Sequence, residues 1–202
     1  MRQSCVRKQW VASWVRKGKA MAEQFEFELI FSLPEGMHDP YALADAVFDA
    51  GYEDAVVGTG NPRLLGVGIE AGGEDAEAVI LQAARAIMKG LPAGTHLREV
   101  RPDLVSLADV AEKLQIKRQA LQQRDMPLPT SGGLYRIDEM LEVLSAAVQP
   151  MSGRRRPRFD FDSARKWFLA GVAARRLNAK LTMQEIDPST IEVVARKDRA
   201  IV

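Results

Sequence analysis

Apolar and polar residues alternate near the start of the sequence and recur at helical spacing further along. The alternation over residues 25–31, where every second side chain is Phe or Leu, predicts a half-buried strand. Later apolar runs bounded by Gly and Pro predict further strands over residues 54–59, 64–69 and 95–100. Apolar residues three and four positions apart predict helices over residues 39–51 and 74–89, each ending near a glycine.

The predicted order is strand–helix–strand–strand–helix–strand, which places the first half of the chain in the α+β class. Over residues 24–100 this order resembles ferredoxin-like and ACT-like accessory domains, which bind small molecules or dimerise. The resemblance implies two helices on one face of a four-stranded sheet. We expect the other face to meet solvent, a partner subunit or the rest of the chain. We expect the apolar side of residues 25–31 to lie on that uncovered face and to favour a dimer.

Residues 106–147 have a different pattern, which predicts two short helices, a tight turn, a β-hairpin and a third helix. Ser106 can cap the first helix, and Asp109 falls in its first turn. Ala111, a small residue on the apolar face of this helix, allows the second helix to cross it closely. Ile116 is expected to fill the turn between them.

The second of these helices carries the candidate DNA-contacting side chains. Lysine, arginine and glutamine can bond to base edges in the major groove, and none of the outward positions is acidic. The predicted base-reading residues are Lys117, Arg118, Gln119, Gln122 and Gln123. Arg124, directly after them, is a candidate phosphate contact. The alternative is a helical hairpin packed on a domain core, with these side chains merely solvated.

The spacing of Ala111, Ile116 and Leu121 resembles the helix-turn-helix of bacterial regulators. The continuation to residue 147 resembles a small winged helix of the MerR or excisionase type. In that class a glycine is usual at the position of Gln115, and a serine at that of Lys117. We therefore expect Gln115 to adopt the left-handed conformation that glycine adopts freely. The resemblance implies binding to double-stranded DNA.

A β-hairpin is predicted between the second and third helices. Two prolines within residues 127–129 favour an extended path, and residues 131–133, Ser-Gly-Gly, have the composition of a turn. Residues 134–137 alternate like a short returning strand, on which Arg136 is a candidate phosphate contact. Asp138 is expected to cap the third helix.

A run of arginines follows this region and could neutralise phosphates, enter a minor groove or form a solvated linker. Its candidate phosphate contacts are Arg154, Arg155, Arg156 and Arg158. A helix is then predicted over residues 163–177, with Trp167 and Phe168 in the core or in a dimer interface. Asp160 and Asp162 are expected to share one face of a strand, where they balance the arginine charge.

The overall net charge of +1 conceals a segregation of charge along the chain. Residues 1–20 carry six basic and no acidic side chains, whereas residues 21–100 carry 4 basic and 14 acidic ones, a net charge of −10. Residues 151–202 carry 12 basic and 6 acidic side chains. This asymmetry suits a chain whose nucleic-acid contacts lie on one side.

Candidate catalytic and metal-binding groups are few. His38 and His96 are the two histidines of the sequence, and neither has a second histidine or a cysteine at ligand spacing. The single Cys5 excludes an intramolecular disulfide, which favours a reducing cytoplasm. The sequence contains no nucleophile elbow, Walker loop or dinucleotide fingerprint, and no apolar run of membrane-spanning length. We therefore expect no enzymatic activity, metal, cofactor or membrane contact.

These patterns predict four segments. They are a basic extension (1–20), a ferredoxin-like domain (21–101), a winged helix-turn-helix (102–149), and a basic linker, helix and tail (150–202). They favour a cytoplasmic, dimeric transcriptional regulator that binds specific double-stranded DNA, whose first domain dimerises or senses a small-molecule or protein effector. The alternative is an antitoxin-like or immunity-like interaction module, whose acidic first half binds a basic partner.

Overall fold

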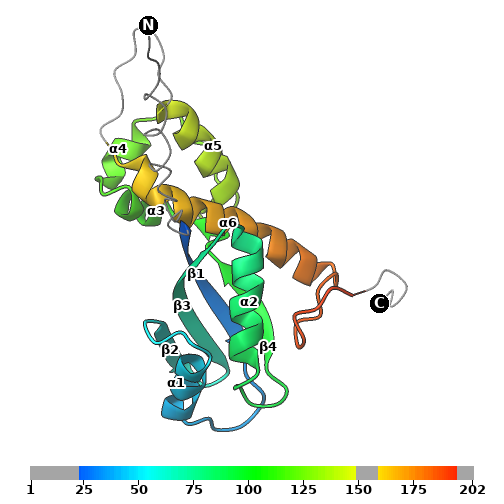
Figure 1. Cartoon of the computed structure of the whole chain (residues 1–202). Helices are drawn as coiled ribbons and strands as arrows, with labels where there is room; N and C mark the ends of the chain where they lie inside the picture. The colour runs from blue at the N-terminus through cyan, green and yellow to red at the C-terminus, as the bar shows by residue number, and fades with distance from the viewer. Residues whose placement is uncertain (1–22, 149–158, 195–202) are drawn as a thin grey trace, which may run out of the picture.

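The structure is a computed structural model that describes residues 23–148 and 159–194 (Figure 1). These residues form a mixed α+β protein with a four-stranded antiparallel sheet and several helices. The strands are β1 (Glu23–Ser32), β2 (Val56–Asn61), β3 (Leu64–Gly73) and β4 (His96–Arg101). Their order across the sheet is β2-β3-β1-β4, so β2 and β4 form its two edges.

Helices pack on one face of this sheet. They are α1 (Pro40–Asp49), α2 (Ala76–Met88) and α6 (Phe161–Thr182). α1 packs over β2, α2 over β3 and β1, and α6 over β1 and β4. The carboxylates of Asp39 and Asp75 start the first two helices by accepting hydrogen bonds from the N–H groups of Tyr41 (3.0 Å) and Ala78 (2.8 Å). Gly51 follows the end of α1 with a φ of +93°, which glycine adopts without steric cost.

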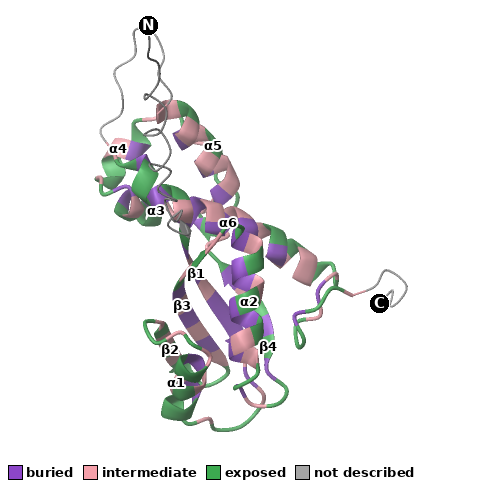
Figure 2. Cartoon of the chain, viewed as in Figure 1, coloured by how far each residue is buried: buried purple, intermediate pink, exposed green. Residues whose placement is uncertain are grey.

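The alternating residues of β1 divide the two faces of the sheet. The apolar side chains are buried against the helices (Figure 2), namely Phe25, Phe27, Leu29 and Phe31. The expectation that this side of residues 25–31 stays uncovered and forms a dimer is wrong. Two helices were expected on the covered face, but a third element, the part of α6 from Ala170 to Leu177, also packs there. The uncovered face carries Glu26 and Glu28 instead.

The outer edge of β4 is covered by segments from the other end of the chain. The side-chain amide of Asn178 bonds to both the N–H and the C=O of Val100, each at 2.8 Å. The carbonyl of Pro188 accepts a hydrogen bond from the N–H of Leu97 at 2.8 Å. These contacts satisfy groups that an edge strand otherwise leaves unpaired. Among the described residues, no other element bonds to the outer edge of β2 in this way.

A second, smaller region is built from short helices and a two-stranded sheet. Its elements are β5 (Leu104–Val105), α3 (Leu107–Lys113), α4 (Arg118–Gln122), β6 (Tyr135–Arg136) and α5 (Ile137–Val148). They enclose their own buried cluster, which the first turns of α6 complete with Ala164, Trp167 and Phe168. Because α6 belongs to both clusters, this one helix contributes to both cores.

The start of α6 differs from the prediction. The helix begins at Phe161, and Asp160 is its N-cap, accepting a hydrogen bond from the N–H of Ser163 at 3.1 Å. Asp162 lies in the first turn of the helix. The strand expected for these two carboxylates is therefore wrong, because both are stabilised by the free N–H groups and the dipole at a helix N-terminus.

Candidate nucleic-acid interface

The N-terminus of α3 is fixed by a capping box. The hydroxyl of Ser106 accepts hydrogen bonds from the N–H groups of Ala108 and Asp109, each at 3.2 Å. The carboxylate of Asp109 accepts one in return from the N–H of Ser106, at 2.8 Å. The predicted cap at Ser106 is confirmed, and it fixes the point at which the chain enters the helix pair.

The turn after α3 sets the direction in which α4 begins. Gln115 has a φ of +53°, so the left-handed conformation expected from its position is confirmed. The N–H of Gln115 bonds to the carbonyl of Glu112 at 3.0 Å, and that of Ile116 to the carbonyl of Ala111 at 2.9 Å. This pair of bonds is a Schellman motif, which usually has glycine at the left-handed position. Ile116 packs against the buried cluster as expected.

α4 is a five-residue helix with one buried anchor, Leu121, which is fully buried. The exposed positions of α4 and its two caps are Lys117, Arg118, Gln119, Gln122 and Gln123. At 3.6 residues per turn, Arg118, Gln119 and Gln122 fall within an arc of about 100° around the helix. The structure thus brings the five candidate base-reading residues together on one short exposed segment.

Arg124 is placed differently from the other candidates. Its guanidinium carbon lies 5.0 Å from the centroid of the Phe159 ring, a cation–π geometry. Its Nε is buried and has no hydrogen-bond partner among the described residues. Arg124 therefore joins the end of α4 to the segment before α6, with one nitrogen still unsatisfied.

The strand predicted over residues 134–137 pairs with a partner that the sequence did not suggest. A tight turn with positive φ at Gly132 and Gly133 closes the expected hairpin, with Thr130 and Leu134 joined by a 2.8 Å backbone bond. β6, however, pairs with β5, the segment just before α3. Pairing with β5 ties the start and the end of the small region together.

The residues at the end of this strand also depart from the prediction. α5 begins at Ile137, so Asp138 lies inside the helix and is not its cap. Arg136 is exposed and forms an ion pair with Glu139 at 3.5 Å. An exposed pair of this kind contributes little energy, so the guanidinium stays available for another anion. The candidates Arg154, Arg155, Arg156 and Arg158 lie outside the described residues, as does the basic extension 1–20.

Two basic residues that the sequence did not single out fix the small region to the sheet. Lys113 at the end of α3 pairs with Glu26 of β1, and its Nζ lies 5.8 Å from the centroid of the Trp167 ring. Arg175 of α6 bridges the carboxylates of Asp103 and Asp138, at 3.0 and 3.2 Å. These partners are 37 to 87 residues apart in sequence, so no local motif could reveal them.

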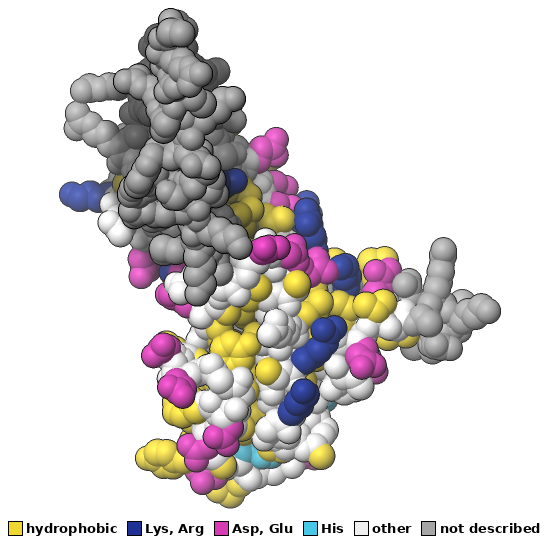
Figure 3. Space-filling view, in the orientation of Figure 1, with side chains coloured by type: hydrophobic (Ala, Val, Ile, Leu, Met, Phe, Trp, Pro, Cys, Tyr) yellow, Lys and Arg dark blue, Asp and Glu magenta, His cyan; other side chains and the backbone are white. Residues whose placement is uncertain are grey.

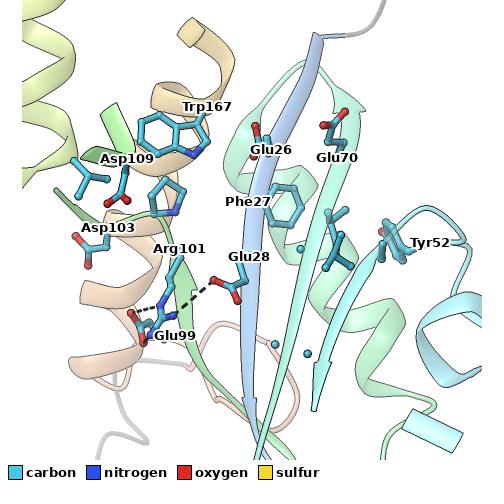
Figure 4. Close-up of a pocket in the computed structure, with 18 of the residues that line it drawn as sticks. Glu26, Phe27, Glu28, Tyr52, Glu70, Glu99, Arg101, Asp103, Asp109 and Trp167 are labelled. Atoms are coloured by element: carbon cyan, nitrogen blue, oxygen red, sulfur yellow. Dashed lines mark hydrogen bonds and ion pairs between the residues drawn. The ribbon is translucent and has the colours of Figure 1, made fainter. Parts of the chain in front are cut away.

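A groove of about 1250 Å³ opens between the uncovered face of the sheet and the β5–α3 segment (Figure 4). Its acidic lining residues are Glu26, Glu28, Asp54, Glu70, Glu99, Asp103 and Asp109. Arg101 contributes a positive charge and contacts Glu99 at 3.1 Å and Glu28 at 3.7 Å. The hydrogen bond with Glu99 is the main reason that the pKa of Arg101 is raised. Burial raises the pKa of Tyr52, which also lines the groove.

The charge of this groove distinguishes it from the surface around α4. Carboxylates on the uncovered sheet face repel a phosphate backbone, whereas the exposed segment of α4 contains cationic and amide side chains and no carboxylate. Figure 3 shows further acidic side chains on the side of the molecule where α1 and β2 lie. The groove on the sheet is therefore acidic, whereas the exposed segment of α4 is basic and amide-rich.

Within residues 23–148 and 159–194, no helix is long and apolar enough to cross a membrane. The same residues contain no group of three His, Cys, Asp or Glu side chains arranged to hold a metal ion. Comparison of the chain with protein-family models, with curated proteins and with solved structures finds no match.

Proposed function

We propose that this protein is a sequence-specific, dimeric transcriptional regulator that binds double-stranded DNA through α4. The observation that carries the proposal is the exposed face of Arg118, Gln119 and Gln122, set by the Schellman turn at Gln115 and anchored by Leu121. Arginine and glutamine are side chains that pair bidentately with guanine and adenine in the major groove.

The finer fold assignments belong to this proposal. The strand order β2-β3-β1-β4, with α1 and α2 on one face, supports a ferredoxin-like first domain. The capping box, the left-handed turn and the β5–β6 pair support a winged helix-turn-helix in the second region. α4 is short for a recognition helix, so we expect its flanking residues, Lys117 and Gln123, to share in base contact.

Phosphate contacts in this proposal come from arginines that follow α4 in the sequence. Arg136 is exposed on β6, and the arginines of 154–158 follow α5 in the sequence. Each phosphate neutralised by such a cation releases counterions, which gives affinity without sequence preference. The acidic groove on the sheet then keeps the first domain off the DNA and free for dimerisation or for an effector.

A second function is favoured by that same groove. Its carboxylates fit an antitoxin-like or immunity-like module in which the acidic first half binds a basic partner protein. This alternative requires no DNA contact by α4. Binding of labelled random-sequence DNA at low salt separates the two, because an interaction module with a net-acidic first half has no reason to bind it.

The test of the regulator begins with sites selected by the full chain from random DNA. Gln119→Ala and Gln122→Ala should each weaken binding to a selected site by about 1–3 kcal/mol and leave non-specific binding nearly unchanged. The matched control is Gln82→Ala, at an exposed position on α2 far from α4 in the sequence. Equal loss of specific and non-specific binding, or no loss of either, contradicts base reading by α4.

A further inference from the structure

The uncovered face of the four-stranded sheet forms the floor of the acidic groove. The register of the sheet places Glu26 of β1 directly opposite Glu70 of β3, and both carboxylates lie on this face (Figure 4). Like charges directly opposite each other destabilise a sheet. Lys113 pairs with Glu26, but no cation pairs with Glu70 among the described residues. This end of the groove therefore has two opposed carboxylates that share a single cation.

The rest of the groove is also richer in acids than in bases. Arg101 is the one cationic side chain among the described residues that line it, and it is shared between Glu28 and Glu99. The groove also contains two exposed apolar side chains, Val56 at 76% and Leu104 at 40% exposed. Its lining therefore fits a segment that carries both cations and large apolar side chains.

Glycines leave room for a backbone on the floor of the groove. Gly66 and Gly68 of β3 lie opposite Gly58 and Val56 of β2, and all four residues line the groove. A glycine inside a strand allows a second backbone to approach closely. The floor can therefore accept a stretch of extended chain as well as single side chains.

We propose that the basic extension of this same chain, residues 1–20, lies in the groove. The extension carries six basic and no acidic side chains, so its charge is complementary to that of the lining. Trp10 and Trp14 supply large apolar side chains that match the exposed Val56 and Leu104. The proposal goes beyond the DNA-binding function and does not depend on contacts made by α4.

The place where the extension joins the sheet favours it over a separate basic partner. β1 begins at Glu23, and the next residue, Gln24, already lines the groove. Along β1 the groove runs from Gln24 to Glu28, which is about 13 Å at 3.3 Å per residue. Twenty residues can span up to about 66 Å, so the extension is long enough to turn back over this length.

Covalent attachment also compensates for the weakness of each contact. A single exposed ion pair contributes little energy. A segment tethered by a short linker, however, has an effective concentration in the millimolar range, and several pairs can form together. A separate basic protein would need the same carboxylates, so it would have to displace the extension first.

The first test uses Cys5, the single cysteine of the sequence, to attach a maleimide-linked nitroxide to the full chain without DNA. The nitroxide broadens the NMR signals of amides that lie near it. In low salt we expect strong broadening at Gly66 and Gly68 on the groove floor. We expect none at Gln82, which is exposed on α2 across the sheet. At about 1 M salt, where the Debye length is about 3 Å, broadening of the floor should fall several-fold.

The second test removes charge from the groove. Glu70→Gln combined with Asp54→Asn neutralises two exposed carboxylates that have no cationic partner among the described residues. The ratio of docked to undocked extension should fall by about two- to thirtyfold, the range spanned by two exposed ion pairs. The matched control, Asp45→Asn/Asp49→Asn, changes the net charge equally on α1, outside the groove, and should leave the broadening unchanged.

Two results overturn the proposal directly. One is the absence of broadening on the floor in low salt. The other is broadening that survives both high salt and the groove variant, because a tethered but undocked segment also broadens signals near its attachment point.

A mixture of chains tests whether the extension occupies a second copy instead. Nitroxide-labelled chain is mixed with isotope-labelled chain carrying Cys5→Ser, and only the second is observed by NMR. We expect no broadening on its groove floor, and broadening there overturns docking within one chain. All of these measurements are made without DNA, so failure of this proposal and failure of base reading by α4 are distinguishable.

Discussion

The first turns of α6 belong to the buried cluster of α3, α4 and α5, whereas its later turns pack on the sheet. Phe168 in the first turns and Leu177 in the later turns are equally well buried, with exposed fractions of 0% and 1%. The surfaces of the two regions differ more than their cores do. The sheet region lines a groove with carboxylates, and the small region exposes Lys117, Arg118 and three glutamines.

A domain boundary usually divides both the buried core and the surface charge, whereas here only the surface charge is divided. The cores are joined by one helix and by the Arg175 bridge to Asp103 and Asp138, so we expect the regions to unfold together. The charges, in contrast, change sign between the sheet and α4. We therefore expect one cooperative folding unit that carries two surfaces of different charge.

The largest expected effect comes from breaking the shared helix. Phe168→Ala leaves a large cavity in the smaller cluster and should lower the free energy of unfolding by about 3–5 kcal/mol. Leu177→Ala, the matched change in the sheet cluster, should lower it by about 2–5 kcal/mol. Denaturation by urea measures the free energy of unfolding of each variant. Native-state hydrogen exchange shows in which region the amides lose protection.

If the regions form one unit, each substitution accelerates exchange of amides in both α2 and α3. Exchange that is accelerated in one region alone, or a denaturation curve with two transitions, would show that the two cores are independent. In that case the sheet region and the small helical region would be separate folding units, with the boundary between them inside α6.

A smaller effect compares how a helix ends in each region. α1 is followed by Gly51 at a φ of +93°, whereas α3 is followed by Gln115 at +53°. A left-handed non-glycine residue costs about 1–2 kcal/mol. Glycine also raises the entropy of the unfolded chain by about 0.4–1 kcal/mol. Gln115→Gly should therefore raise the free energy of unfolding by up to about 1 kcal/mol.

The mirror substitution is Gly51→Ala. No atom lies within 4 Å of the added Cβ, so the loss of stability should come from the backbone conformation alone, at about 1 kcal/mol. Thermal unfolding of the two variants and of the wild type measures both changes in stability. Stabilisation by Gly51→Ala, or a loss in Gln115→Gly, would contradict the assigned conformations.

The smallest effect concerns two carboxylates at opposite ends of the α6 segment. Hydrogen bonds from the Ser163 hydroxyl and N–H lower the pKa of Asp160, and those from Ser189 lower the pKa of Asp187. A lowered pKa in the folded state stabilises the fold above the ordinary Asp value of about 3.9, and this is lost as the pH falls through the folded pKa. Ser163→Ala should raise the pKa of Asp160, as followed by NMR titration, and leave that of Asp187 unchanged.

Local signals in the sequence predicted the local features of both regions. Ser106 caps α3 as expected, and α1 begins near residue 39 as expected, because a helix start depends on residues two or three positions away. The left-handed Gln115 and the Gly132–Gly133 turn follow from equally short spacings. These features lie within a few residues of their partners, so a single sequence contains all the information they need.

Features that depend on distant partners were missed. β6 pairs with β5 across about thirty residues, and α6 covers the phenylalanines of β1 from more than a hundred residues away. Asp138 has the residue type of a cap, yet it serves as a partner of Arg175 inside a helix. Composition predicted the exposed face of α4, but no pattern in the sequence indicated that α6 would hold α4 and the sheet together.

The contact of Asn178 with Val100 has a consequence for how far the sheet can grow. One side-chain amide occupies the N–H and the C=O that a fifth strand would need, so β4 cannot serve as a template. Any added strand would therefore have to approach β2, the edge that no other described element covers. A sheet with one closed border cannot add strands in both directions, which open-ended growth of a fibre from repeated copies of one chain requires.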